Sequence, residues 1–177
     1  FMTLAAEDNM QIVNTTTAAN YFHLLRRQVH SERRTPLIVF SPKQGLRMKQ
    51  TRSPIDALTQ GSFEEVLDDP GDIDPNAVTR IVFCSGKVAW DAIDERDRRG
   101  APVAVVRVEQ LYPLPTEQML GILARYPNAR ELRWLQEEPE NMGAWRFIEA
   151  NTWRVKEQGY DLRHVARVES GSPATGS

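Results

Sequence analysis

Cysteine and long apolar runs are scarce in this sequence. The single cysteine, Cys84, excludes a disulfide framework within the chain and gives no reason to expect an oxidising compartment. No apolar run approaches the ~20 residues that a membrane-spanning helix needs, so we expect no membrane partner. No secretory signal pattern follows Phe1. These features predict a cytoplasmic protein, and the first residue, which is not methionine, indicates a piece of a longer chain.

The sequence also lacks an excess of one charge and the residue spacings that are typical of metal ligands. The formal net charge is −2. Since no basic block provides the dense positive face that releases counterions from a phosphate backbone, we expect no nucleic-acid partner. His23, His30 and His164 are scattered and have no paired carboxylate or HxxxH spacing. We therefore predict no metal site in this chain.

What the sequence does contain is a series of strand patterns. Continuous short apolar runs are typical of strands buried on both faces of a parallel sheet. Segments that alternate polar and apolar residues are typical of strands nearer an edge. Runs of the first kind lie at 36–40, 80–84 and 102–108, and segments of the second kind lie at 131–135 and 162–168.

Helical patterns separate these strands. Ala18, Phe22, Leu25 and Val29 recur at helical spacing, which predicts that this face packs against the core, with an N-cap among residues 15–17.

Three further helices are expected between the later strands. They cover residues 86–99, 119–126 and 143–158, and the first and last stop at Gly100 and Gly159. From residue 79 onward strands and helices alternate. This order predicts an α/β fold with right-handed crossovers and helices on both faces of a mainly parallel sheet.

The domain organisation follows from a change in composition. Residues 42–78 are rich in proline, glycine and polar residues and are interpreted as a linker with one short helix, because Ser62 and Glu65 have capping-box spacing. We expect residues 1–41 to end one α/β domain and residues 79–168 to form another. Residues 169–177 are expected to be a tail.

Two motifs near the end of the strand at 80–84 suggest chemistry that their context does not favour. Ser85-Gly86-Lys87 resembles part of a phosphate loop, but Ile81 replaces the earlier glycine and Val88 replaces the magnesium-binding hydroxyl. We interpret Ser85 as a helix cap, leaving open an anion at that helix N-terminus. Cys84 is interpreted as a core residue rather than a nucleophile, since no basic neighbour in sequence would depress its pKa.

The stretch LQEEPENMGAW, residues 135–145, holds three glutamates at the end of a strand. We interpret it as the start of a helix, with Asn141 as the candidate N-cap and Glu138 and Glu140 near the positive end of the helix dipole. A catalytic acid pair of Glu137 and Glu138 stays open as the alternative, because ligands also bind at the carboxyl ends of strands.

Six segments in order resemble one enzyme family. They are YFHLLRRQ, PLIVFSPKQGLR, CSGKV, VAVVRVEQLYPLP, LQEEPENMGAW and SPATGS. Together they span nearly the whole chain and resemble the C-terminal part of the first, decarboxylating component of the 2-oxoglutarate dehydrogenase complex, including its multifunctional actinobacterial forms. The resemblance implies a transketolase-like fold, in which residues 1–41 close the pyrimidine-binding domain and residues 79–168 form the C-terminal domain.

The same resemblance implies cofactors and partners for the full-length enzyme. These are thiamine diphosphate and magnesium, a homodimeric partner, the lipoyl-bearing dihydrolipoamide succinyltransferase and dihydrolipoamide dehydrogenase. The GDG-and-asparagine motif of the cofactor site and the active-site histidines are absent from this sequence. We therefore expect no catalytic residue and no cofactor bound by this chain alone.

Four arginines at the end of the first predicted helix suggest a different function. Arg26, Arg27, Arg33 and Arg34 cluster there, and the resemblance implies effector binding of an adenine nucleotide or acetyl-CoA near this junction, with Arg26, Arg27 and Arg34 as candidates. The alternatives are a solvated basic helix end, a free-standing sensor of adenine nucleotides or acyl-CoA, and a chain that serves only dimerisation and docking.

Overall fold

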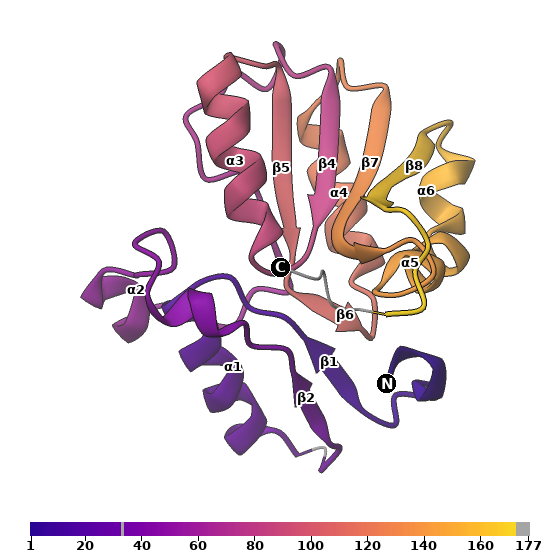
Figure 1. Ribbon diagram of the computed structural model, residues 1–177. Coiled ribbons are helices and arrows are strands. Elements are labelled where there is room, and N and C mark those ends of the chain that lie inside the picture. The colour runs from indigo at the N-terminus through magenta and orange to yellow at the C-terminus, as the bar shows by residue number, and fades with distance from the viewer. Residues whose placement is uncertain (33, 173–177) are drawn as a thin grey trace.

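The computed structural model describes residues 1–32 and 34–172 and contains two sheets (Figure 1). The smaller sheet has the order β2-β1-β6, with β1 and β2 parallel and β6 antiparallel to β1. Its strands are β1 (Gln11–Val13), β2 (Leu37–Val39) and β6 (Gln110–Tyr112). Because β6 belongs by sequence to the later part of the chain, this sheet joins segments about a hundred residues apart.

The larger sheet has the order β3-β5-β4-β7-β8 and is parallel except for β3. Its strands are β3 (Val66–Leu67), β4 (Arg80–Cys84), β5 (Val103–Val108), β7 (Glu131–Pro139) and β8 (Asp161–Arg167). The expected mainly parallel sheet is confirmed, with the apolar runs at 80–84 and 102–108 as its inner strands β4 and β5 and the alternating segment of β8 at its edge. Two predicted strand positions are wrong. The alternating segment at 131–135 forms the inner strand β7, and the apolar run at 36–40 forms β2, a half-buried edge strand of the smaller sheet.

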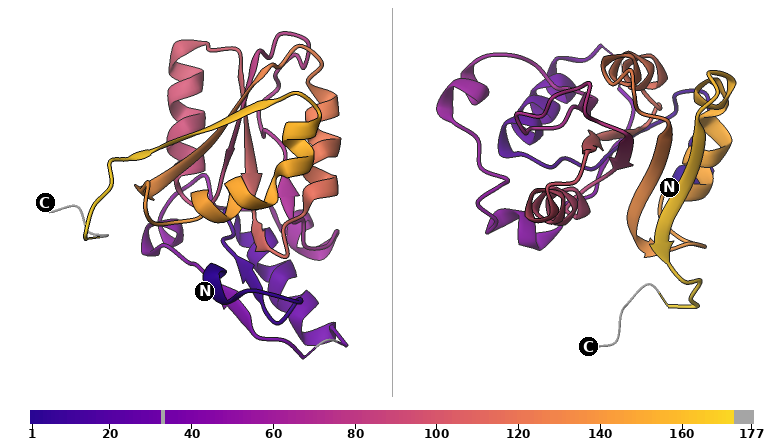
Figure 2. Two further views of the ribbon diagram at one scale, coloured as in Figure 1. Left: turned by 90° about the vertical axis from the view of Figure 1, so that its right-hand side faces the viewer. Right: turned by 90° about the horizontal axis from the view of Figure 1, so that it is seen from above.

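Helices cover both faces of the larger sheet, as predicted (Figures 1 and 2). On one face α3 packs Ala89, Trp90 and Ile93 against Val105. On the other, α4, α5 and α6 contribute Leu123, Ile148, Val155 and others to a larger cluster. Their bounds are α3 (Val88–Arg99), α4 (Thr116–Arg125), α5 (Trp145–Asn151) and α6 (Trp153–Glu157). None of the helices among the described residues is long and apolar enough to cross a bilayer.

The remaining helical segments belong to the first part of the chain. They are η1 (Met2–Leu4), α1 (Ala18–His30), η2 (Lys43–Leu46) and α2 (Ile55–Thr59). The α1 N-cap is Thr17, whose hydroxyl accepts the Asn20 N–H at 3.3 Å, as the sequence predicts.

The prediction of which face α1 buries is wrong. Phe22, Leu25 and Val29 are 46%, 44% and 73% exposed, whereas the buried face carries Asn20 and His23 with two apolar residues. Hydrogen bonds make this burial possible: His23 Nε2 lies 2.8 Å from the Ala57 carbonyl, and Asn20 donates to the Glu64 carbonyl at 2.9 Å. Hydrogen-bonded polar side chains can thus occupy a buried face that apolar periodicity does not identify, although His23 Nδ1 has no partner among the described residues.

The expected helix after Ser62 is also wrong. Val66 and Leu67 form β3, which pairs with the end of β5, and the short helix α2 comes earlier, after Pro54. The Glu65 carbonyl accepts the N–H groups of Glu109 and Gln110 at 2.9 and 3.0 Å, so pairing with a distant strand overrides the local capping pattern. The proposed division at residues 41 and 79 stays a prediction.

The helix predicted for residues 143–158 is in fact two, because it breaks at Thr152. The Thr152 hydroxyl donates to the Ile148 carbonyl at 2.7 Å, a side-chain bond that competes with the helical backbone pattern. The predicted ends are confirmed, since Gly100 and Gly159 follow α3 and α6 with φ of 60° and 85°. Arg33 and the tail residues 173–177 lie outside the described residues.

Candidate functional site

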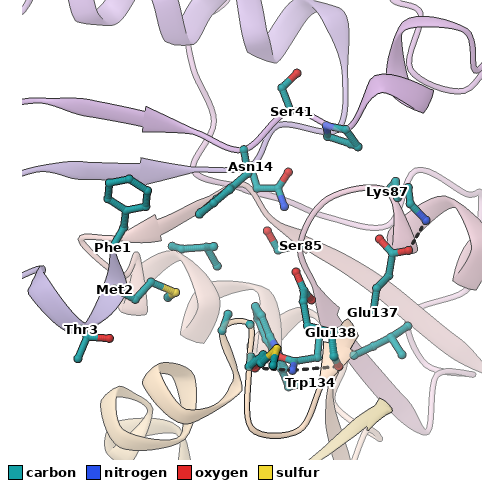
Figure 3. Close-up of a pocket in the computed structure, with 18 residues that line it drawn as sticks. Phe1, Met2, Thr3, Asn14, Ser41, Ser85, Lys87, Trp134, Glu137 and Glu138 are labelled. Atoms are coloured by element: carbon teal, nitrogen blue, oxygen red, sulfur yellow. Dashed lines mark hydrogen bonds and ion pairs between the residues drawn. The ribbon is translucent and has the colours of Figure 1, made fainter. Parts of the chain in front are cut away.

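A cavity of about 570 Å³ lies where the carboxyl ends of strands from both sheets meet (Figure 3). Asn14 directly follows β1, Ser85 directly follows β4, and Gln136 to Glu138 lie near the carboxyl end of β7. In open parallel sheets this edge is where ligands bind, so the cavity is the candidate site. Its apolar lining includes Phe40, Leu111, Trp134, Leu135 and Met142.

Gln136 organises the glutamate-rich stretch below this cavity. Its Oε1 accepts the Trp134 indole N–H at 3.2 Å and the Trp145 backbone N–H at 2.9 Å. Its Nε2 donates to the carbonyls of Pro139 and Met142 at 3.1 and 2.9 Å. Gln136 therefore holds the turn closed and satisfies an N–H group at the start of α5, as a cap does. The stretch does start a helix, as interpreted.

The expected N-cap Asn141 is wrong, because its side chain is used elsewhere. Asn141 Nδ2 donates to the Ser170 carbonyl, and its Oδ1 accepts the Ser170 N–H, both at 3.0 Å. This pair joins the turn to the residues after β8. The position that precedes α5 is Ala144, so a glutamine eight residues earlier provides the hydrogen bond that a local cap would have made.

The two candidate acids of this stretch do not form a pair that shares one site. Glu137 forms an ion pair with Lys87 at the start of α3, and the Glu138 side chain points into the cavity instead (Figure 3). Both residues are exposed. Because an opposite charge engages one carboxylate and solvent reaches both, the geometry favours the structural interpretation over acid catalysis.

The Ser85-Gly86-Lys87 turn packs against Asn14 rather than capping a helix. α3 starts after Lys87 without a side-chain cap, so the expected Ser85 cap is wrong. Gly86 has φ of 74°, and a Cβ there would lie 2.5 Å from Asn14 Nδ2. This contact explains why a glycine is required. Ser85 Oγ and Asn14 Oδ1 are buried atoms with no hydrogen-bond partner among the described residues.

Cys84 is a core residue, as predicted. Its side chain is fully buried, and burial raises the pKa of its thiol to about 12. The thiol therefore stays protonated at neutral pH and is a poor nucleophile.

A buried polar network lies between the two sheets, and the sequence interpretation missed it. Thr16 donates its N–H and its hydroxyl to the Glu109 carboxylate at 2.8 and 2.5 Å, and Asn20 Nδ2 donates to it at 3.0 Å. Arg107 donates to the Thr16 hydroxyl at 3.3 Å and lies over the Trp90 ring. The signal was present in VAVVRVEQ, where Arg107 and Glu109 interrupt an apolar strand.

The structure does not bring the three candidate effector arginines to one internal site. Arg27 forms an ion pair with Glu65 at 3.1 Å and donates to the side chains of Gln11 and Gln110, each at 2.6 Å. Arg26 and Arg34 are exposed. Arg27 is thus held by neighbouring elements, whereas Arg26 and Arg34 face solvent.

The described residues show no cluster of side chains suited to a metal ion. No group of three or more histidine, cysteine, aspartate or glutamate side chains in the described ranges could hold a metal ion. Magnesium needs several oxygen ligands in near-octahedral arrangement.

The fold and the site define a transketolase-like α/β protein whose sheets meet at a polar seam. A model of the transketolase pyrimidine-binding domain matches residues 1–49, and a model described as 2-oxoglutarate dehydrogenase C-terminal matches residues 52–177. The chain belongs to the 2-oxoglutarate dehydrogenase C-terminal family, and the resemblance drawn from the sequence is confirmed.

Individual relatives agree with this assignment. The 2-oxoglutarate dehydrogenase E1 component of Rickettsia felis is 44% identical over 100% of this chain and 18% of its own length. The E1 components of Shouchella clausii and Cupriavidus necator are each 42% identical over 99% of this chain and 19% of their own length. The chain therefore spans about a fifth of the length of the curated relatives it matches.

Proposed function

We propose that this chain is the C-terminal part of a cytoplasmic 2-oxoglutarate dehydrogenase E1 component. The whole enzyme decarboxylates 2-oxoglutarate with thiamine diphosphate and magnesium and transfers the succinyl unit to the lipoyl group of dihydrolipoamide succinyltransferase. It works as a homodimer in a complex that also contains dihydrolipoamide dehydrogenase. In this proposal residues 1–41 close the pyrimidine-binding domain, and residues 79–168 form a C-terminal domain that supports assembly.

The observation that carries this proposal is the way residues 1–41 are joined to residues 79–168. The VEQLYP segment, one of those on which the family resemblance rests, contains Glu109 and β6. Strand β6 completes the smaller sheet, and Glu109 accepts hydrogen bonds from Thr16 and Asn20 in the first part of the chain. A second segment that carries the family resemblance, QEEPENMGAW, forms the turn that the Gln136 side chain holds closed. Both segments contribute to structure, which supports a role in holding the enzyme together rather than in the reaction itself.

The test separates catalysis from assembly. The purified 177-residue chain is mixed with thiamine diphosphate, magnesium and 2-oxoglutarate, and carbon dioxide release is measured. We expect none, because effective catalysis requires all reacting groups in one site. A full-length enzyme without this segment should lose its dimeric state or its solubility, since apolar surface would be exposed. Decarboxylation by the chain alone, or a truncated enzyme that stays dimeric and active, would contradict the proposal.

We further propose that Arg26 and Arg34 bind an anionic effector, with Arg27 positioning α1. Both side chains are exposed, and neither forms an ion pair among the described residues, so their charges are available. Calorimetric titration of the full-length enzyme with AMP and with acetyl-CoA tests this. Saturable binding that weakens in Arg26→Gln and Arg34→Gln is expected, while unchanged binding in both variants would exclude these residues.

A further inference from the structure

The loop between β2 and α2 carries four basic side chains that form no ion pair with the described residues, and we call it the basic loop. Its basic residues are Lys43, Arg47, Lys49 and Arg52, all exposed. None forms an ion pair with any described residue. The loop directly precedes α2, at the side of the molecule away from β8 (Figure 1). Four like charges in ten residues repel one another and would gain from an anionic partner.

Several exposed arginines elsewhere in the chain are paired, whereas the four cations of the basic loop are not. Arg98 and Arg99 both contact Glu95, at 2.6 and 2.5 Å, and Arg154 forms an ion pair with Glu117. The chain as a whole has a net charge of −2, so the positive character of the loop is local. A surface of this kind attracts an anion to one face of the molecule.

Beside the basic loop lies a cavity of about 380 Å³ without an acidic lining residue. Leu46 and Met48 of the loop line it together with Tyr21 and Trp90. Leu46 is 87% exposed. An apolar side chain of a partner could fill this cavity and cover Leu46, while flanking carboxylates meet the basic residues at its rim.

The hydrogen bonds at the start of α1, which also lines this cavity, argue against a single bound phosphate. The Ala18 N–H donates to the Thr51 carbonyl at 2.8 Å, Ala19 to Ser53 Oγ at 3.0 Å, and Asn20 to Thr17 Oγ1 at 3.3 Å. The helix N-terminus thus offers these N–H groups to its own chain and not to an anion. Of the two aromatic residues that line the cavity, Trp90 is buried and offers no face to a nucleic-acid base, so only Tyr21 is exposed for stacking.

We propose that the basic loop and this cavity form a docking surface for an acidic polypeptide segment with an apolar anchor residue. The cations are spread over a length that a row of carboxylates matches better than one small anion does. The anchor enters between Leu46 and Tyr21, and acidic residues on both sides of it approach Arg47 and Arg52. This inference is independent of the proposed enzymatic function.

The proposal is tested by fluorescence anisotropy with the 177-residue chain. The probe is a short fluorescein-labelled peptide of aspartate and glutamate around a central leucine, at about 50 mM salt, where exposed charges are weakly screened. We expect saturable binding that weakens as salt rises. The double variant Arg47→Gln/Arg52→Gln should bind about threefold to thirtyfold more weakly. Leu46→Ser should weaken binding about tenfold, since it removes apolar contact.

The matched control is Arg98→Gln/Arg99→Gln, which removes the same charge from exposed positions at the opposite end of α3 from Lys87. It should leave binding within about twofold of the parent chain. Circular dichroism verifies that each variant is folded. Absence of saturable binding, equal weakening in the control, or tighter binding of single-stranded oligothymidylate or anionic vesicles than of the peptide would each overturn the proposal.

Discussion

Thr16 donates both its backbone N–H and its hydroxyl to the carboxylate of Glu109, at 2.8 and 2.5 Å, across 93 residues of sequence. Thr16 precedes α1, and Glu109 lies between β5 and β6. The contact therefore joins the smaller sheet to the larger one through a buried carboxylate. A buried polar group of this kind is stable only while its hydrogen bonds are made, so it also fixes how the two parts fit.

The first prediction concerns the pH dependence of this contact. Burial raises the pKa of Glu109 above its ordinary value of 4.5, although hydrogen bonds from Thr16 and Asn20 act in the opposite direction. The folded chain then binds the proton more tightly than the unfolded chain does. The stability contributed by Glu109 is therefore full below pH 4.5 and is lost as the pH rises through the raised folded pKa. Urea unfolding at several pH values measures this trend.

Two substitutions at the same position serve as its controls. In Glu109→Gln the amide can keep all three contacts, since its oxygen can accept from Thr16 and Asn20 while its N–H₂ donates to the Thr16 hydroxyl. We expect this variant to fold and to lose the pH trend. Glu109→Leu leaves the buried donors unpaired and should cost about 3 kcal/mol or more. If the pH trend persists in Glu109→Gln, another group causes it.

A second prediction concerns the close approach of Gly143 to Gln136. Gly143 has φ of 67°, and a Cβ there would lie 2.9 Å from Gln136 Nε2. Gly143→Ala should therefore destabilise through both backbone strain and the displaced side chain. Gly100→Ala is the control, because its φ of 60° carries only the backbone cost of about 1–2 kcal/mol and its added Cβ meets no atom within 4 Å. Equal losses in urea unfolding would mean that the contact with Gln136 is unimportant.

The third prediction concerns the buried ion pair of Arg96 and Asp69, 2.6 Å apart with side chains 5% and 0% exposed. Asp69 also accepts the Val105 N–H at 2.7 Å. Arg96→Met leaves a buried carboxylate without its cation and should cost about 3–5 kcal/mol. Glu95→Gln, which breaks exposed pairs with Arg98 and Arg99, should leave the melting temperature unchanged. A small loss for Arg96→Met would show that Asp69 finds another partner or is solvated.

The fourth prediction compares the glutamates of the 135–145 stretch with its tryptophan. Trp145 is 5% exposed and stacks on His164 with ring centroids 4.6 Å apart. Trp145→Ala should cost about 3–5 kcal/mol. Glu137→Gln and Glu138→Gln should each change stability by less than about 1 kcal/mol, because both side chains are exposed. Melting and turnover are measured together in the full-length enzyme. A stable but inactive glutamine variant would restore the catalytic interpretation.

Patterns between near neighbours determined much of the fold in advance. The apolar run of residues 80–84 and the glycine at 100 gave a strand and a helix end where they were expected, because side-chain burial and left-handed backbone depend on local sequence. Trp145 and Ile148, three residues apart in the predicted helix, are both buried, as helical spacing favours. The resemblance rested on such segments too, and the family matches agree with it.

Only the tertiary structure decided the features that depend on contacts between distant residues. Asn20 and His23 are buried in place of Phe22 and Leu25 because distant groups bind them: the Glu64 carbonyl and the Glu109 carboxylate accept from Asn20, and the Ala57 carbonyl contacts His23 Nε2. Val66 and Leu67 became a strand because β5 offered an edge to pair with. The sequence by itself determined most of the strands and helices and the family, since propensity and periodicity act over a few residues. Which faces meet, and where the cavity lies, depended on hydrogen bonds and packing that only the folded chain brings together.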